Sequence, residues 1–440
     1  MDRRNFLKIG AAGTAAASLG LATGFSPEPR KKEIEAKTRL DVKGYVSEPA
    51  RKIPVVDAAD IVVLGGGPAG VAAAVSAARQ GLDVILLERE YYLGGLWTGC
   101  CVLPVNNTSG LLKNGKWGQV IYGFSDEICS RLASMGLSVT IKGDTPVPDP
   151  EAAKYVMELM LGEAGVRLLY NCQGAGVILS GDRIDAVLVE SKSGRVAIKA
   201  KAVVDCSGDG DILEWAGEDF ELRKAHIGAM WRCGNAADFK RRGVHKTPID
   251  SVKLFHTNGE YDQDGLDIYN LTRLQLKMRK HMWDTLEKDR QLPGGENLFL
   301  LDSTTLLGVR VTRVLNSVRN VTYADSVRYA SYADCVGVAG ADNSLKYSGG
   351  TLPGKKRPVW QLPYSAITPK RIPNLLVAGR CFGFDKDLTY DAREVGTCFL
   401  TGQAAGTAAA LSLLDRCSVQ EVNIVRLQAR LAEGGVRFDM

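Results

Sequence analysis

Three glycines and an acid are the first residues along this chain that could bind a charged ligand. Gly65, Gly67 and Gly70 form a G-x-G-x-x-G pattern, and Glu88 follows about twenty residues later. Gly65 would allow a tight turn, Gly67 would let the backbone approach a pyrophosphate, and Gly70 would let a helix pack closely. Glu88 could accept hydrogen bonds from both hydroxyls of a ribose and would repel a 2′-phosphate, which argues against NADP. The spacing predicts a dinucleotide site; the alternative is a glycine-rich turn in an ordinary α/β protein.

A strand, a helix and a second strand must hold these residues in place. Residues 61–64 are apolar and rich in β-branched side chains, as in a buried parallel strand, and residues 71–79 are alanine-rich and helical. Gly81 would end the helix, and residues 82–87 form a second strand that leads to Glu88. The glycine pattern therefore lies inside a complete β-α-β unit, which is the context that makes it specific.

Two later apolar runs, 202–206 and 374–378, also have the composition of buried strands that end at a ligand. The small or charged residues that follow them are Ser207, Gly208 and Asp209 after the first run, and Gly379 and Arg380 after the second. A helix of small residues, 399–408, comes after the second run. Small residues at the start of a helix let it come close to a flat or charged ligand.

These segments together resemble the FAD-dependent oxidoreductases, in the exported bacterial branch of the broad group that includes glutathione reductase and the fumarate reductase flavoproteins. The resemblance rests on DIVVLGGGPAG with Glu88, LGGLWTG, VVDCSGDGDI, and NLLVAGRCFGFD followed by AREVGTCFLTGQAAGTAAA, and it spans roughly residue 58 to the C-terminus. It implies FAD as the cofactor. It also implies an α/β fold, with a three-layer, Rossmann-like FAD-binding domain and an inserted α+β substrate domain.

The resemblance implies where FAD would bind. The residues implied at the pyrophosphate and the adenosine ribose are Gly65, Gly67, Pro68, Ala69, Gly70, Glu88 and Arg89. Those implied near the ribityl chain, the phosphates, the second sugar–phosphate motif or the isoalloxazine are Gly94, Gly95, Thr98, Ser207, Gly208, Asp209, Gly379, Arg380 and Asp385. Val177 would meet adenine through its backbone. Thr401, Gly402, Gln403 and Ala404 would place a helix N-terminus near the flavin pyrimidine ring, where the dipole would stabilise negative charge on the reduced ring.

The chain of 440 residues is long enough for two domains or for one domain with a large insertion. We expect a twin-arginine signal and linker over 1–57, the first part of the FAD-binding domain over 58–217, an inserted substrate domain over 218–363, and the rest of the FAD-binding domain over 364–440. The signal is expected from Arg3-Arg4 and the uncharged apolar run 9–25, which is too short and too rich in Gly and Ala for a stable membrane span. It predicts export to the periplasm or another extracytoplasmic site; the alternative is a chance Arg pair before an apolar helix.

Composition argues against several other classes of protein. The net charge of +5 is concentrated in the N-terminal tail, so nucleic-acid binding has little support. The four His are scattered and no C-x-x-C occurs, so no metal site is expected. Most of the ten Cys are expected to be buried free thiols, although Cys100-Cys101 follows a glycine-rich loop near the expected cofactor and a redox role is an alternative.

Residues just before the expected flavin-facing helix are the best placed candidates for catalysis. Arg393 could bind a substrate carboxylate or stabilise an anion, and Tyr390 could relay a proton. The alternative for Arg393 is a structural ion pair with Glu394 or Asp391.

Charged residues of the inserted region are further candidates. Arg310 and Arg313 could reach the site, but solvated surface arginines are the favoured interpretation. His226 or His256 could be the catalytic base, but a hydrogen-bonded structural role is favoured for both.

The predicted function is that of an exported FAD-dependent oxidoreductase. It would transfer hydride between the flavin and a small organic substrate, a sugar derivative or an organic acid, with an unidentified electron acceptor or donor. The alternative is a catalytically degenerate flavin-fold binding protein, motivated by Ser207, where the family usually has Thr. An NAD-only enzyme would have no reason to carry the C-terminal TGQAAG helix.

Overall fold

Four stretches of the chain are described by the computed structural model: residues 44–142, 144–257, 259–341 and 358–440. The twin-arginine segment expected near the N-terminus lies outside them, together with most of the expected linker. All the described residues belong to one of the two units into which the chain divides, Thr38–Met440.

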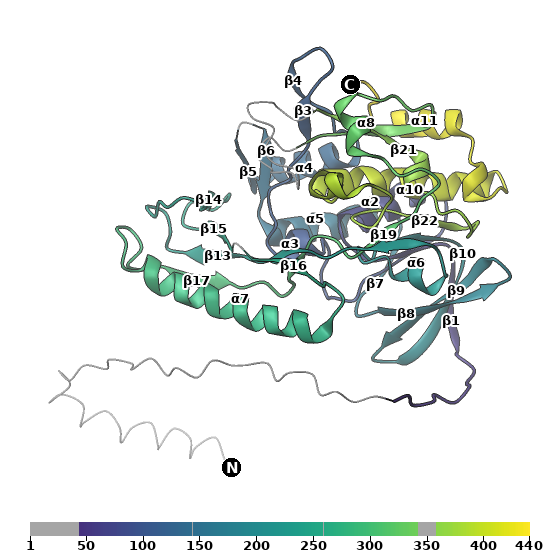
Figure 1. The fold of residues 1–440 in the computed structure, drawn as a ribbon, viewed down its shortest axis with the longest axis horizontal. Coiled ribbons are helices and arrows are strands. Elements are labelled where there is room, and N and C mark those ends of the chain that lie inside the picture. The colour runs from purple at the N-terminus through teal and green to yellow at the C-terminus, as the bar shows by residue number, and fades with distance from the viewer. Residues whose placement is uncertain (1–43, 143, 258, 342–357) are drawn as a thin grey trace. The chain divides into compact units, whose positions relative to one another are not determined.

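Five parallel strands carry the strand ends that the sequence predicts to face a ligand (Figure 1). β1 (Val55–Leu64) lies between β2 (Val84–Leu87) and β10 (Gly194–Asp205), while β7 (Arg167–Leu169) pairs with β2 and β22 (Leu375–Val377) pairs with β10. Their order in space, β7-β2-β1-β10-β22, is the 3-2-1-4-5 order of dinucleotide-binding sheets. Because the strands are parallel, the turns that follow them meet at one edge of the sheet.

Charged residues do not interrupt the two central strands, although the sequence predicted breaks near them. β10 begins at Gly194, before the apolar run predicted at 202–206, and β1 begins at Val55, before the run predicted at 61–64. Asp60 of β1 and Lys201 of β10 form an ion pair of 2.7 Å between the neighbouring strands. Because the two opposite charges neutralise each other, both strands continue through Asp60 and Lys201 without a break.

The sheet lies between two layers of different kinds. On one face, β8 (Gln173–Ser180) and β9 (Arg183–Ser191) form an antiparallel meander with the first half of β10, and Val187 of β9 packs in one cluster with Leu64 and Ile85. The other face is covered by α2 (Pro68–Ala78), α4 (Phe124–Ser134), α5 (Pro150–Glu163) and α10 (Val395–Leu414). The prediction of an α/β fold with three layers is therefore confirmed.

The two central helices, α2 and α10, touch through their backbones. A Cβ on Gly402 would lie 2.1 Å from the carbonyl oxygen of Ala69, and a Cβ on Gly406 would lie 2.0 Å from that of Ala73. Real atoms cannot approach so closely, so these positions require glycine. α10 is long and apolar enough to cross a membrane, but 89% of its most apolar window is buried inside the protein, as expected of a core helix.

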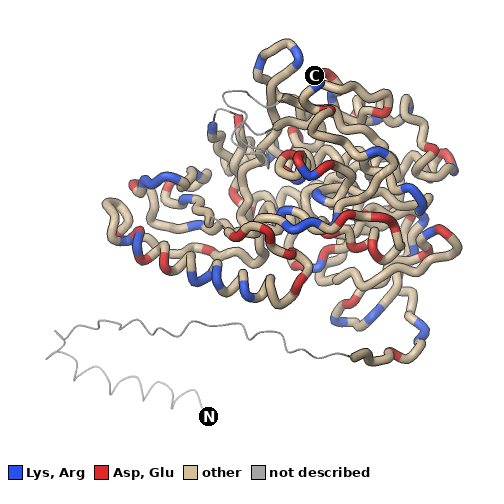
Figure 2. Tube along the Cα trace, viewed as in Figure 1, with Lys and Arg blue, Asp and Glu red and all other residues tan. Residues whose placement is uncertain are grey.

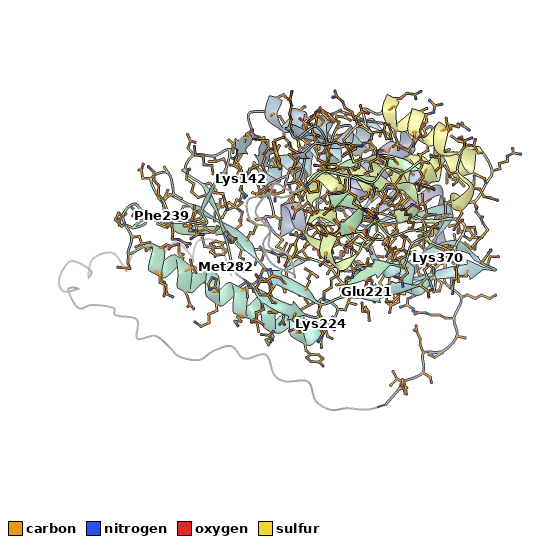
Figure 3. The ribbon with its side chains drawn as sticks, turned by 45° about the horizontal axis from the view of Figure 1, so that its top comes forward. Lys142, Glu221, Lys224, Phe239, Met282 and Lys370 are labelled. Atoms are coloured by element: carbon orange, nitrogen blue, oxygen red, sulfur yellow. The ribbon has the colours of Figure 1, made fainter. Side chains whose placement is uncertain are left out.

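The middle of the chain forms smaller sheets. β13 (Met230–Gly234), β14 (His245–Lys246), β15 (Lys253–His256) and β17 (Phe299–Asp302) form one sheet, which α7 (Ile268–Asp289) covers (Figure 1). Phe239 and Met282 fill the space between them (Figure 3). Charges of both signs follow the exposed side of α7 (Figure 2), where Lys280 and Asp284 pair at 2.7 Å. The boundaries of an inserted domain at 218 and 363 remain predictions.

The remaining elements connect these layers. They are α3 (Leu96–Gly99), β3 (Ser109–Leu111), β4 (Trp117–Gln119), β5 (Ser138–Ile141), β6 (Thr145–Pro148), α6 (Asp211–Trp215), β11 (Phe220–Leu222), β12 (Ala225–Gly228), β16 (Glu260–Gln263), β18 (Gly308–Val309), β19 (Arg313–Leu315), α8 (Tyr323–Val327), β20 (Cys335–Ala339), β21 (Trp360–Pro363), η1 (Tyr364–Ala366), η2 (Lys386–Leu388), α9 (Thr389–Ala392), η3 (Val419–Glu421) and α11 (Ile424–Glu433). Among them, β22 and α9 bring the C-terminal part of the chain back to the edge where the parallel strands end.

The contact between α2 and α10 gives a testable expectation. Gly406→Ala should lower the free energy of unfolding by about 2 kcal/mol, because the added methyl group forces the two helices apart. Urea denaturation followed by circular dichroism measures this change. The matched control is Gly162→Ala in α5, where a Cβ would meet nothing within 4 Å. That substitution should stabilise the protein by about 0.5–1 kcal/mol. Equal effects of the two substitutions would contradict the tight crossing.

Candidate functional site

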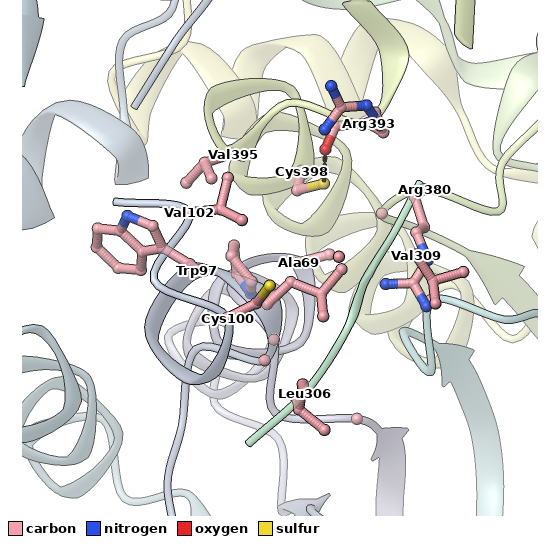
Figure 4. Close-up of a pocket in the computed structure, with 18 of the residues that line it drawn as sticks. Ala69, Trp97, Cys100, Val102, Leu306, Val309, Arg380, Arg393, Val395 and Cys398 are labelled. Carbon is pink, nitrogen blue, oxygen red and sulfur yellow. Dashed lines mark hydrogen bonds between the residues drawn. The ribbon is translucent and has the colours of Figure 1, made fainter. Parts of the chain in front are cut away.

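A cavity of about 390 Å³ lies at the edge where the parallel strands end (Figure 4). Leu64 ends β1, Glu88 follows β2, Cys206 follows β10 and Gly379 comes shortly after β22, and all four border this strand-end cavity. In open α/β sheets this edge is the usual place for a ligand. The structure therefore brings the separate strand ends predicted from the sequence to one site.

The three glycines of the first turn have three different surroundings. A Cβ on Gly65 would lie 2.4 Å from the carbonyl oxygen of Cys206, and a Cβ on Gly70 would lie 1.7 Å from that of Gly65. A Cβ on Gly67 would meet nothing within 4 Å, because Gly67 borders the strand-end cavity. Gly67 also precedes α2, whose N-terminus has no side-chain cap and no acid in its first turn. Open space beside an uncapped helix N-terminus fits a phosphate group.

Glu88 lies beside this turn and is only 6% exposed. Its Oε2 accepts a hydrogen bond from the Gly66 N–H at 2.6 Å and its Oε1 accepts one from the Glu90 N–H at 2.8 Å. Burial raises the pKa of the Glu88 carboxyl. Each oxygen keeps a further lone pair for a ligand hydroxyl, so the position fits the ribose role expected from the sequence.

Adenine contact was expected from Val177, but this residue pairs with Val187 in the β8–β9 hairpin and does not border the cavity. Cys172, Gln173 and Gly174 border it instead. The Cys172 N–H donates to the Glu88 carbonyl at 2.9 Å, which brings the start of β8 to the end of β2. The position of these residues at the cavity depends on contact between two strands that are distant in sequence, so no local sequence motif predicts it.

The second strand end positions a buried arginine. Asp205 accepts hydrogen bonds from both the N–H and the Oγ of Ser207, which fixes the turn. Arg380 donates from Nη2 to Asp209 Oδ1 at 2.7 Å. Burial opposes ionisation of Asp209, but the Arg380 guanidinium outweighs it and lowers the pKa of Asp209. Asp209 therefore does not border the cavity but fixes the position of Arg380, which does.

The helix N-terminus expected at Thr401–Ala404 is wrong in position, because α10 begins at Val395. Thr401 and Gln403 bond to the backbone N–H groups of Gly379 and Phe124, and Gly402 packs on α2. Gly402 serves the helix crossing, and the four residues do not border the cavity. The residues that border the cavity are those that begin the helix, Arg393, Glu394, Val395 and Cys398 (Figure 4).

The predicted cofactor and catalytic residues divide into two groups. Those that border the strand-end cavity are Gly65, Gly67, Pro68, Ala69, Glu88, Arg89, Gly95, Ser207, Gly208, Gly379, Arg380 and Arg393. Those that do not are Gly70, Gly94, Thr98, Val177, Asp209, Asp385, Tyr390, Thr401, Gly402, Gln403 and Ala404. Two members of the second group have clear structural roles: Thr98 donates to the Leu93 carbonyl, and Asp385 accepts from the N–H groups of Tyr323 and Leu388.

The interpretation of Arg310 and Arg313 as solvated surface residues is wrong. Arg313 is 9% exposed and pairs with Asp211 and Glu214. Arg310 borders the cavity and donates from Nη1 to the carbonyl oxygen of His226 at 2.9 Å. Burial, and then the charge of Arg393, lower the pKa of Arg310 to about 10.

Arg393 lies opposite, at the start of α10. Its Nη2 pairs with Glu394 Oε1 at 2.8 Å, and Asn106 donates to the other oxygen of Glu394 at 3.2 Å. The guanidinium carbon lies 5.8 Å from the centre of the Tyr390 ring. The ion pair considered from the sequence is therefore present, and Arg393 still borders the cavity.

The histidines and cysteines have limited reactivity. His256 borders the cavity, whereas His226 is buried and its ring lies 4.4 Å from the Tyr261 ring, tilted by 47°. All ten Cys are free thiols, as expected for most of them. Burial raises the pKa of Cys100, which borders the cavity, to about 12, so it is a poor nucleophile near neutral pH. In the described stretches, no three His, Cys, Asp or Glu side chains converge on a metal position.

Asp211 begins α6 and borders the same cavity. Burial, followed by the carboxylates of Asp205 and Asp209, raises the pKa of Asp211 to about 7, while Arg313 opposes this shift. Near neutral pH the Asp211 carboxyl is therefore only partly ionised. A ligand that carries phosphates meets less repulsion at this position than it would from an ordinary aspartate.

Comparison with protein families gives two matches. The family described as FAD dependent oxidoreductase matches residues 60–229 and 223–431. The twin-arginine translocation signal sequence matches residues 1–20.

Curated relatives match part of the chain. A digeranylgeranylglycerophospholipid reductase of Methanococcoides burtonii is 28% identical over 185 residues, which are 39% of this chain and 43% of the reductase. A thiamine thiazole synthase of Methanococcus vannielii is 28% identical over 161 residues, 34% of this chain and 56% of the synthase. The chain thus spans about half the length of the curated relatives it matches.

Solved structures match over more of the chain but with low identity. A geranylgeranyl bacteriochlorophyll reductase-like protein of Thermoplasma acidophilum has a TM-score of 0.46 and 15% identity, covering 86% of this chain and 84% of its own. The L-amino acid deaminase of Proteus myxofaciens has a TM-score of 0.45 and 13% identity, covering 87% and 95%.

The raised pKa of Asp211 predicts a pH-dependent stability. Its pKa is about 7 in the folded protein, whereas the usual pKa of an aspartate is 3.8, so this group stabilises the fold below pH 3.8 and loses that contribution as the pH rises through 7. Asp211→Asn should therefore raise the free energy of unfolding at about pH 8 by about 1 kcal/mol or more, and change it little at about pH 4. Urea denaturation of the protein without added FAD, at both pH values, measures the difference. Asp182→Asn, on the exposed turn between β8 and β9, is the control and should show no such pH dependence.

Proposed function

The chain belongs to the FAD-dependent oxidoreductase family, whose cofactor is FAD, and we propose that it oxidises or reduces a small organic molecule after export across the cytoplasmic membrane. The observation that carries this proposal is the strand-end cavity, because one space is bordered by the glycine turn, by Glu88 and by the start of α10. An elongated dinucleotide needs these three features together.

The residues fit FAD in chemical terms. The open space at Gly67 and the uncapped start of α2 would hold the pyrophosphate, with Arg380 adding positive charge, and Glu88 would bind the adenosine ribose. The N-terminus of α10, which has neither a side-chain cap nor an acid in its first turn, would face the flavin ring. When bound, FAD supplies the hydride or electron transfer.

The chain itself would orient the substrate and handle the proton. Glu394 is 4% exposed and borders the cavity between Arg393 and Asn106, so its carboxylate is fixed in place. We assign Arg393 to substrate orientation and Tyr390, beside the Arg393 guanidinium, to proton relay. Of these three groups Glu394 is buried, whereas Arg393 and Tyr390 are partly exposed.

Substrate and location are the finer parts of the proposal. The substrate is a sugar derivative or an organic acid, hydride moves between it and the flavin, and an electron acceptor or donor completes the cycle. The twin-arginine segment supports export, and the periplasm or another extracytoplasmic site is the proposed location. Twin-arginine export carries folded proteins, which suits one that folds around a cofactor.

Flavin content and turnover together test the proposal. The purified protein, reconstituted with FAD, should show the yellow absorbance of bound flavin, and an anaerobic panel of sugars and organic acids should include a donor that bleaches it. Protein that holds no flavin after reconstitution would contradict the proposal. Flavin that binds and is photoreduced and reoxidised, but is bleached by no donor in the panel, would favour the catalytically degenerate binding protein.

Gly67 separates cofactor binding from folding. Gly67→Leu should abolish FAD binding, because the side chain would fill the space proposed for the pyrophosphate. It should leave the unfolding temperature of the FAD-free protein unchanged, since the backbone at Gly67, with φ −69° and ψ −179°, is open to any residue. Gly162→Leu is the matched control, as a Cβ there also meets nothing within 4 Å, and it should keep full flavin content. Flavin content equal to wild type in Gly67→Leu would place the pyrophosphate elsewhere.

A further inference from the structure

Two arginines from distant parts of the chain lie at the α10 end of the strand-end cavity. Arg310 follows β18, and Arg393 immediately precedes α10 (Figure 4 labels Arg393). Both side chains border the same cavity, as does Glu394 beside Arg393. The charge of Arg393 also contributes to the lowered pKa of Arg310. We call them the arginine pair.

The charges of the arginine pair are not balanced by the groups around them. Among the described residues no carboxylate oxygen lies within 4.0 Å of Arg310, whose hydrogen bond goes to the His226 carbonyl. Arg393 has Glu394 as its ion-pair partner. Counted within 4.0 Å among the described residues, two guanidiniums and one carboxylate leave a charge of +1, and the buried Asp391 lies beyond that distance and accepts a hydrogen bond from Asn107. The Nε atoms of both arginines are also buried without a hydrogen-bond partner.

The place proposed for the FAD pyrophosphate is too far from the arginine pair for a phosphate there to supply the missing negative charge. That place is the first turn of α2, where Ala69 touches Gly402. Gly402 comes seven residues after Val395, the first residue of α10. At a rise of about 1.5 Å per residue, the start of α10 lies about 10 Å beyond that crossing. The arginine pair therefore belongs to the far end of the site, where the substrate meets the flavin.

We infer that the arginine pair binds the carboxylate of the substrate, an inference that rests on the proposed function. Guanidinium forks match a carboxylate through paired hydrogen bonds, and they retain their charge in buried positions. The excess of +1 suits one carboxylate better than a phosphate monoester, which carries about −1.5 to −2. Between the two proposed substrate classes, this selects an organic acid, a sugar acid included, over a neutral sugar.

Matched pairs of small ligands test this inference. Benzoate and acetate should bind the FAD-loaded protein, measured by titration calorimetry and by a shift of the flavin absorbance, at least about tenfold more tightly than benzamide and acetamide. Phenyl phosphate should bind more weakly than benzoate. Equal binding of acids and amides, no binding of either, or tighter binding of phenyl phosphate would each overturn the inference.

Substitutions assign the effect to the arginines. Arg310→Gln should weaken benzoate binding at least about tenfold, and Arg310→Lys and Arg393→Lys should weaken it less, because lysine keeps the charge but loses the fork. Arg223→Gln is the matched control: Arg223 is a buried arginine with unpaired nitrogens outside the cavity, and this variant should bind benzoate as wild type does. Unfolding temperatures of all variants report whether each has folded.

Three further results distinguish another role for the pair, failure of the proposed function, and failure of the inference alone. If Arg310→Gln shifts the flavin absorbance without ligand and leaves benzoate binding unchanged, the pair acts on the flavin and not on the substrate. If the protein holds no flavin, the proposed function fails, but calorimetry with benzoate on that same protein still tests the pair. Retention of flavin with loss of the difference between acid and amide would overturn only the inference.

Discussion

The backbone contact between α2 and α10 is the constraint on which the rest of the site depends. Gly402 and Gly406 lie against the carbonyl oxygens of Ala69 and Ala73 at distances that leave no room for a Cβ. This contact fixes where each helix begins relative to the other. Both uncapped N-termini then border one cavity, about 10 Å apart along α10. Larger residues at the crossing would move the two helix ends apart, even if every residue that borders the cavity stayed the same.

Arginines and helix N-termini lie at two places on the cavity, although acids such as Glu88 and Glu394 border it as well. Arg380 is balanced by Asp209 and Arg393 by Glu394, whereas the acceptor of Arg310 within the described residues is a carbonyl oxygen. Burial of an unbalanced charge costs free energy unless a ligand of opposite sign removes the imbalance. The site is thus organised for anionic groups at two places, one beside α2 and one beside α10.

The sequence predicted the parts of the site that are local. Gly65, Gly67 and Gly70 act within a few residues of one another, so their pattern defines the turn. The start of α10 was misplaced, because the same small residues suit a helix crossing and a ligand contact equally well. Arg310 and Arg313 are three residues apart, yet one borders the cavity and the other pairs with Asp211 and Glu214. Pairing between strands distant in sequence decides which of the two side chains reaches the cavity, and no local sequence pattern predicts that pairing.

The local and non-local parts of the site correspond to its two tasks. The glycine turn proposed to bind FAD comes from one β-α-β unit, and this alone predicts a cofactor shared across the family. Arg310 directly follows β18, which pairs with β12 through Gly308 and Gly228. The two strands are close there, because a Cβ on Gly308 would lie 3.0 Å from the Gly228 carbonyl oxygen. A different residue at this strand pair would change the surroundings of Arg310 and leave the glycine turn before α2 unchanged. Family membership therefore determines the cofactor, while the substrate depends on contacts that each chain makes for itself.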